Sequence, residues 1–170
     1  MPMTNAPRLP NLPRWLVWSG LVATVLALSW LRFGTSGAHG QARVIDGDSL
    51  VVNGREVRLK GIDAPEGRQT CRRNDATWAC GEEARRHLTG LISNRQVRCG
   101  GAESDQHGRL LGTCEVAGRS LNAAMVEDGY AVSYGGTYQR EEARARGERR
   151  GLWSGEFERP RDWRDTHPRR

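Results

Sequence analysis

The sequence predicts a small α+β protein, a five-stranded Greek-key barrel of the OB-fold type with three helices, preceded by one N-terminal hydrophobic helix. Two observations predict this fold class. Short apolar runs rich in β-branched residues are separated by turns that contain Gly or Asn, as is typical of strands. Helical patterns interrupt these runs after the third and the fifth strand, which fits an OB barrel. The expected strands are residues 44–45, 50–52, 57–59, 96–99 and 110–116.

The most distinctive stretch of the chain is residues 46–66, which contains several acidic residues and a predicted hairpin at Asn53-Gly54. Asn-Gly between two apolar runs is a strong hairpin signal, and the second strand folds back beside the first. This pairing lets Asp48 and Asp63 converge at adjacent strand ends, where two carboxylates suit a hard cation such as Ca²⁺. Arg58 lies on the returning strand and could hold a phosphate in the same cleft. The alternative is a surface hairpin with ordinary turn aspartates and a solvated arginine.

Three later segments have the apolar spacing of helices. Residues 81–93 carry acids in the first turn and apolar side chains three and four positions apart. The second expected helix spans 121–127, and the third, 139–149, is highly charged. The basic segment after residue 157 contains proline, and we expect it to wrap the surface before it frays.

Residues 15–31 form an apolar run without a charged side chain, and tryptophans lie near both of its ends. Indoles favour membrane interfaces, and this length is the short end of a membrane-spanning helix. The expected parts are a cytoplasmic tail (1–14), a transmembrane signal anchor (15–33), a linker (34–41), an exported domain (42–164) and a basic tail (165–170). The domain would lie on the extracytoplasmic side of a bacterial inner membrane. The alternative is a cleaved signal peptide and a secreted protein, because Ser36-Gly37-Ala38 resembles a cleavage site.

The chain is mildly basic. It has 26 Lys and Arg against 20 Asp and Glu, and its first 41 residues contain Arg8, Arg14 and Arg32 but no acid. This balance is consistent with a polyanionic partner and does not establish one.

Four cysteines allow three pairings. Cys71 and Cys80 bracket a polar insert, and Cys99 ends one expected strand while Cys114 lies in the next. We therefore expect the disulfides Cys71–Cys80 and Cys99–Cys114, which agree with an oxidising compartment. The alternative is a structural zinc site, but such sites usually contain closely spaced Cys-x₂₋₄-Cys pairs, which this sequence lacks.

Five motifs, in this order, resemble those of the staphylococcal nuclease (thermonuclease) family. They are Asp46–Leu50, Arg58–Glu66, Asp105–Arg109, Leu121–Ala131 and Gly151–Trp153. The resemblance covers about residues 42–163, and the cysteine-containing insert is similar to that of a membrane-associated bacterial subset. It implies an OB-fold barrel with three helices that cleaves phosphodiesters in DNA and RNA with Ca²⁺.

The resemblance also implies roles for particular residues. The implied metal ligands are Asp48, Asp63 and the main-chain carbonyl of Ala64. The implied catalytic residues are Arg58 and Arg109 on the scissile phosphate and Glu66 on the attacking water. The chemistry supports these roles, because a metal supplies Lewis acidity, arginines match phosphate oxygens and a carboxylate can orient water. Pro65 stiffens the chain between Asp63 and Glu66.

Some positions depart from the family pattern. Ser49 replaces a threonine and keeps its hydroxyl, whereas His107 stands where a tyrosine is usual. Tyr134 matches one tyrosine of the nucleotide pocket, the second falls at Gly136, and Tyr138 could replace it. The implied substrate-binding residues are Asp105, His107, Tyr134 and Tyr138.

Two classes of function are therefore weighed. The first is a monomeric, Ca²⁺-dependent, sugar-nonspecific nuclease that prefers single strands and has no protein partner. The second is a non-catalytic OB-fold module that binds nucleic acid at the membrane, for which a basic groove and stacking aromatics suffice. The combination of acids and arginines favours the nuclease, because a pure binding protein gains nothing from acids that face a phosphate.

Overall fold

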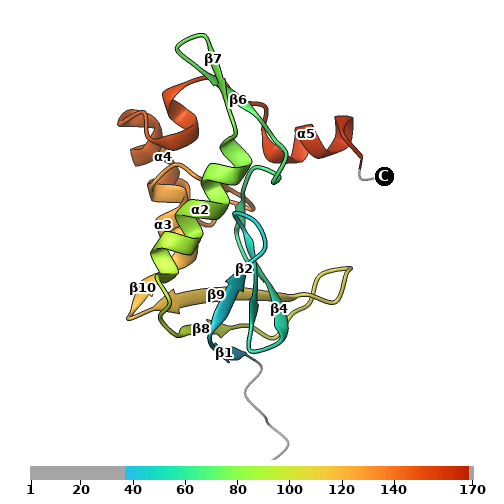
Figure 1. Ribbon diagram of the computed structural model, residues 1–170. Helices are drawn as coiled ribbons and strands as arrows, with labels where there is room; N and C mark the ends of the chain where they lie inside the picture. Colours follow the sequence, from blue (N-terminus) through green and yellow to red (C-terminus); the bar gives the residue numbers. More distant parts are fainter. Residues whose placement is uncertain (1–36, 169–170) are drawn as a thin grey trace, which may run out of the picture. The chain divides into compact units, whose positions relative to one another are not determined.

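The computed structural model describes residues 37–168. Their core is a mixed, barrel-like sheet with the strand order β1-β8-β9-β4-β3-β2, and β10 pairs with β9 (Figure 1). The strands are β1 (Ala38–Gly40), β2 (Ala42–Val44), β3 (Ser49–Val52), β4 (Arg55–Leu59), β8 (Val97–Gly100), β9 (Leu110–Val116) and β10 (Arg119–Ser120). β4 and β9 are parallel, and the other pairs are antiparallel. The α+β barrel is confirmed, and the five expected strands correspond to β2, β3, β4, β8 and β9, although the first covers 42–44 rather than 44–45.

Two small sheets complete the strand structure. β5 (Ile62–Asp63) pairs with β11 (Val132–Ser133), and β6 (Cys71–Arg73) pairs with β7 (Ala76–Trp78) to form a hairpin. The β5 strand is short, yet its pairing with β11 fixes the position of Asp63 opposite Val132.

The helices follow the apolar spacing of the sequence, with one addition. They are α2 (Cys80–Ile92), α3 (Leu121–Glu127), α4 (Gln139–Gly147), the 3₁₀ helix η1 (Gly151–Ser154) and α5 (Pro160–Thr166). α2 buries Ala84, Leu88 and Ile92, which lie four residues apart on one face. Figure 1 shows α2, α3 and α4 grouped together and α5 apart from them. Residues 37–168 thus hold four α-helices rather than three, because Pro160 starts a helix in the segment expected to wrap the surface.

Both expected disulfides are present. Cys99 and Cys114 are direct partners in the β8–β9 pair, so their pairing follows from the register of the sheet. The Cys71–Cys80 disulfide joins the β6–β7 hairpin to the first residue of α2. Beside it, Val132 and Leu152 form a second apolar cluster, separate from the barrel interior.

The expected domain boundaries need correction at both ends. Residues 38–40, expected in the linker, form β1 because their backbone groups pair with β8. α5 continues to Thr166, beyond the expected end at 164. Among residues 37–168 no helix is long and apolar enough to cross a membrane. The expected tail at 1–14 and anchor at 15–33 lie outside the described residues.

Candidate active site

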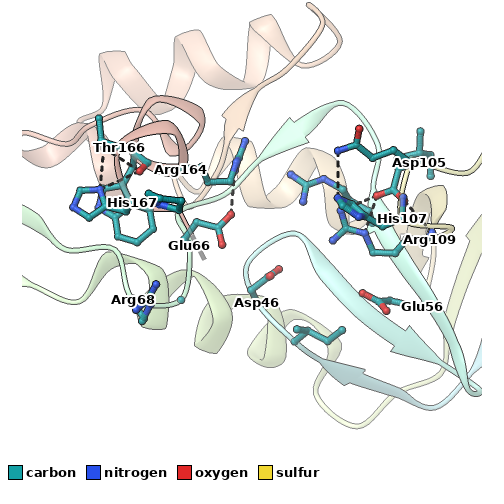
Figure 2. Close-up of a pocket in the computed structure, with 17 residues that line it drawn as sticks. Asp46, Glu56, Glu66, Arg68, Asp105, His107, Arg109, Arg164, Thr166 and His167 are labelled. Carbon is teal, nitrogen blue, oxygen red and sulfur yellow. Dashed lines mark hydrogen bonds and ion pairs between the residues drawn. The ribbon is translucent and has the colours of Figure 1, made fainter. Parts of the chain in front are cut away.

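A cleft of about 1680 Å³ opens beside the first hairpin. In Figure 2 one wall carries Asp105, His107 and Arg109, and the opposite wall carries Glu66, Arg68 and the residues of α5. The ionisable residues along it, histidines aside, are Asp46, Glu56, Arg58, Glu66, Arg68, Asp105, Arg109 and Arg164. The cleft therefore brings Arg58, Glu66 and Arg109, the three expected catalytic residues, into one site.

Asp48 lies directly before β3 and is only 3% exposed. Its carboxylate accepts hydrogen bonds from the Ser49 hydroxyl at 2.9 Å and the Ala64 N–H at 3.2 Å. The Asp46 carboxylate accepts the Asp48 N–H at 3.1 Å, so Asp46 shapes the turn. Burial raises the pKa of Asp48 to about 6, although the neighbouring Arg58 lowers it.

Arg58 forms ion pairs with both Asp48 and Asp63, the two aspartates that we expected to converge. The β3–β4 register places Arg58 opposite Ser49, next to Asp48. Its Nη2 lies 2.9 Å from Asp48 Oδ2 and 3.1 Å from Asp63 Oδ1. Asp63 is also buried, and burial raises its pKa despite hydrogen bonds from Arg164. Two buried carboxylates thus share one arginine nitrogen.

The residues around these aspartates fit a hard divalent cation. Asp48 and Asp63 offer carboxylate oxygens and Ala64 a main-chain carbonyl, the ligand class that Ca²⁺ and Mg²⁺ prefer. Because burial penalises both carboxylate charges, a cation would relieve a real cost. Within residues 37–168 no group of three or more His, Cys, Asp and Glu side chains is arranged to hold a metal. The remaining ligands would have to be water or substrate oxygens.

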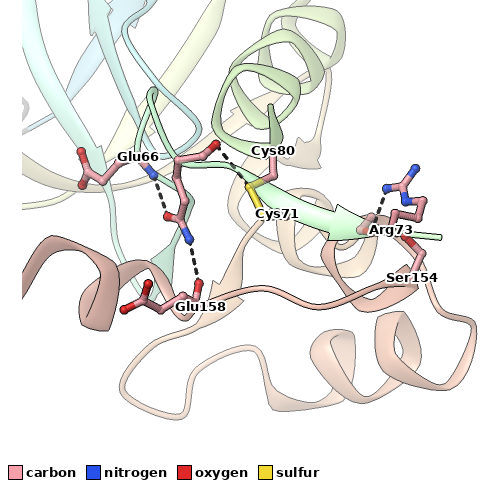
Figure 3. Close-up of a disulfide and its surroundings, with 8 residues drawn as sticks. Glu66, Cys71, Arg73, Cys80, Ser154 and Glu158 are labelled. Atoms are coloured by element: carbon pink, nitrogen blue, oxygen red, sulfur yellow. Dashed lines mark hydrogen bonds between the residues drawn. A yellow bond between two sulfur atoms is a disulfide. The ribbon is translucent and has the colours of Figure 1, made fainter. Parts of the chain in front are cut away.

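Glu66 is held in place by a buried glutamine that the sequence did not single out. Gln69 is fully buried, and its Oε1 accepts the Glu66 N–H at 3.2 Å. Its Nε2 donates to the carbonyl of Glu158 at 2.7 Å, just before α5 (Figure 3). The carbonyl of Gln69 in turn accepts the Gly81 N–H at 3.2 Å and lies 3.4 Å from Cys80 Sγ. Gln69 thereby ties the Glu66 turn to α2 and to the segment leading into α5.

Arg109 is positioned by Asp105 across the loop between β8 and β9. Arg109 Nε donates to Asp105 Oδ2 at 2.7 Å. Asp105 Oδ1 accepts the N–H groups of His107 and Arg109 at 2.9 and 3.0 Å. Burial raises the Asp105 pKa, but the hydrogen bonds and charge of Arg109 outweigh it, so the pKa is lowered overall. Asp105 therefore stays ionised and orients Arg109, while the exposed His107 lines the cleft.

The two expected substrate tyrosines do not line this cleft. Tyr134 is 54% exposed, and its N–H donates to the Gly61 carbonyl at 2.9 Å. Tyr138 packs against the barrel core, where burial raises its phenol pKa. Tyr134 directly follows β11, and Tyr138 directly precedes α4.

Arg164 is a second site residue, after Gln69, that sequence reasoning missed. From α5 its Nη1 reaches Asp63 Oδ1 at 2.9 Å and Glu66 Oε1 at 3.2 Å. Its Nη2 reaches Asp63 Oδ2 at 3.2 Å. The carboxylates of Asp63 and Glu66 raise the Arg164 pKa further, against the effect of burial. The only sequence signal was Pro160, a favoured first residue of a helix.

Comparison with known proteins agrees with this geometry. Residues 56–155 match the family described as staphylococcal nuclease homologue. The chain belongs to this family. It is 37% identical over 121 residues to the succinoglycan biosynthesis protein ExoI of Rhizobium meliloti, covering 67% of this chain and 63% of that protein. It is 39% identical over 132 residues to protein ParB of Escherichia coli, covering 66% and 70%.

A third relative is the probable endonuclease LCL3 of Verticillium alfalfae, 34% identical over 127 residues, which are 64% of this chain and 43% of that protein. The chain thus spans less than two thirds of the length of ExoI and of LCL3. The family match ends before α5, so Arg164 lies outside the matched residues of this staphylococcal nuclease homologue.

Proposed function

We propose that this protein is a Ca²⁺-dependent nuclease that hydrolyses phosphodiester bonds in DNA and RNA, with a preference for single strands. The observation that carries the proposal is the arrangement of one cleft. Arg58, which lines the cleft, contacts the buried carboxylates of Asp48 and Asp63, and Arg109 and Glu66 stand on opposite walls. A relative named as a probable endonuclease supports the same class of activity.

Each side chain has a definite task in this mechanism. Asp48, Asp63 and the Ala64 carbonyl would hold the cation, which supplies Lewis acidity to a non-bridging phosphate oxygen. Glu66 orients the attacking water and accepts its proton. Arg58 and Arg109 donate hydrogen bonds to the phosphate oxygens as negative charge grows on the pentavalent transition state. Asp105 holds the Arg109 fork toward the cleft.

The second candidate is a non-catalytic nucleic-acid-binding module. It would use the same arginines and would need no cation. The buried carboxylates argue against it, because a protein that only binds nucleic acid gains nothing from burying two acids, which costs free energy.

We infer that the domain works outside the cytoplasm, tethered through the apolar segment 15–33 or secreted after its cleavage. Two disulfides among the described residues support an oxidising compartment. A monomer with DNA or RNA as its partner is the simplest form of the proposal.

The deciding experiment uses the full chain with both disulfides oxidised. Plasmid, single-stranded DNA and RNA are incubated with Ca²⁺, Mg²⁺ or EDTA, and Ca²⁺ binding is measured separately by calorimetry. We expect cleavage with Ca²⁺, faster on single strands, and none with EDTA or with Glu66→Gln. Ca²⁺ binding without cleavage would reject the nuclease, and nucleic-acid binding with no cleavage under any of these conditions would favour the binding module.

A further inference from the structure

The α5 wall of the cleft carries two aromatic rings that the proposed mechanism does not use. Trp163 and His167 both line the cleft, and their ring centroids lie 4.4 Å apart with an angle of 7° between the planes. They are four residues apart, so they stand one above the other on the same face of the helix. Trp163 is half-buried and His167 is exposed, so this stacked pair faces solvent in the cleft.

Hydrogen bonds fix the geometry of this pair. His167 Nδ1 lies 3.0 Å from the Trp163 carbonyl and 2.9 Å from Thr166 Oγ1. The His167 N–H also donates to the Trp163 carbonyl at 3.0 Å. The imidazole is therefore oriented before any ligand arrives, which reduces the ordering cost of binding.

The pair lies beside the reaction centre. Arg164, next to Trp163, reaches both Asp63 and Glu66. Arg68 lies on the same wall as His167 and Glu66 (Figure 2), is exposed and forms no ion pair with any residue in 37–168. A flat aromatic surface next to an unpaired guanidinium matches the two chemical parts of a nucleotide, its base and its phosphate.

We propose that Trp163 and His167 form a stacking subsite for one unpaired nucleobase next to the scissile phosphate, and that Arg68 binds the adjoining backbone phosphate. This inference rests on the proposed nuclease function and assigns the base contact to α5 rather than to Tyr134. Bases inside a duplex already stack on each other, so only a single-stranded or frayed substrate can use the subsite. The subsite therefore gives a physical reason for a single-strand preference.

The test measures binding of fluorescent single-stranded DNA to the full chain by anisotropy, in EDTA so that no cleavage occurs. One oligonucleotide is intact, and a second of equal length carries abasic sites throughout. Trp163→Leu should weaken binding of the intact strand about tenfold, the scale of one lost base stack, and leave the abasic strand nearly unchanged. Trp163→Phe keeps a ring and should keep most of the affinity.

A second measurement separates binding from chemistry. With Ca²⁺, Trp163→Leu should raise KM on single strands and leave kcat within about twofold, because the ring does not touch the reacting atoms. Equal losses on intact and abasic strands, or no loss on either, would overturn the subsite while leaving the nuclease in place. If the wild-type chain neither binds nor cleaves nucleic acid, both proposals fail. Thermal unfolding of each variant shows whether α5 and the domain remain folded.

Discussion

Arg164 donates two parallel hydrogen bonds to the carboxylate of Asp63, at 2.9 and 3.2 Å. The two residues lie 101 positions apart in the chain, and the same guanidinium also reaches Glu66. The α5 helix thus supplies an internal cation for a carboxylate that burial would otherwise leave costly. A divalent cation bound at Asp63 would compete with this guanidinium for the same oxygens.

Arg164→Gln should therefore increase the affinity of the full chain for Ca²⁺. We expect about a tenfold lower Kd by calorimetry, because the metal no longer displaces a charged hydrogen-bond donor. Arg161→Gln is the matched control, since Arg161 lies exposed on the same helix and changes the net charge equally. Weaker Ca²⁺ binding in Arg164→Gln would show instead that Arg164 arranges the carboxylates for the metal.

Arg109→Ala should reduce kcat at least ~100-fold on single-stranded DNA, the scale of losing a charge partner of the transition state. Glu66→Ser should cost a similar factor through loss of the group that orients water. Arg98→Ala is the control for charge, because Arg98 lies exposed on β8 and does not line the cleft. Turnover near the wild-type rate in either site variant, with an unchanged unfolding temperature, would refute the role assigned to that residue.

The stability of the metal-free protein should depend on pH through Asp48. Its folded pKa, about 6, lies above the ordinary value of 3.8, so the folded state binds this proton more tightly than the unfolded chain. The proton on Asp48 therefore stabilises the folded state fully below about pH 4, and this stabilisation is lost as pH rises through about 6. The shift corresponds to about 3 kcal/mol, and Asp63, whose pKa burial also raises, acts in the same direction.

Urea unfolding of the full chain in EDTA, from pH 4 to pH 8, measures this effect. The free energy of unfolding of the wild type should fall relative to that of Asp48→Asn as pH rises. A wild-type free energy of unfolding that stays constant or rises relative to that of Asp48→Asn as pH rises would contradict the burial of the Asp48 charge.

Gln69→Leu should lower both stability and kcat. The substitution keeps the side-chain volume but removes the bonds to the Glu66 N–H and the Glu158 carbonyl, which leaves buried groups unpaired at a cost of about 1–3 kcal/mol. The Glu66 turn and the segment before α5 would then no longer be connected through the side chain of residue 69. Gln96→Leu serves as the control, because Gln96 is exposed before β8.

The two effects can be separated by measuring kcat at a temperature where both variants are fully folded. A stability loss with an unchanged kcat would show that Gln69 supports the fold alone. We expect the kcat loss to persist, since Gln69 bonds to the Glu66 backbone and so holds a residue that lines the cleft.

Local sequence patterns, namely the hairpin turn and the spacing of the strands, predicted the parts of the site that lie on paired strands. The Asn53-Gly54 turn sets the β3–β4 register, and this register brings Arg58 to Asp48. The Cys99–Cys114 disulfide follows from neighbouring antiparallel strands in the same way. The expectation for Tyr134 was drawn from a motif position alone, and this residue is not among those that line the cleft.

The sequence by itself therefore determined the barrel, both disulfides and the carboxylate–arginine centre, because hairpin pairing and β-branched periodicity are local properties. Only the tertiary structure decided which side chains close the cleft. Gln69 meets Glu158 across 89 residues, and Arg164 meets Asp63 across 101. No periodic signal marks such contacts, since they depend on how a seven-residue helix docks against a turn fixed elsewhere in the chain.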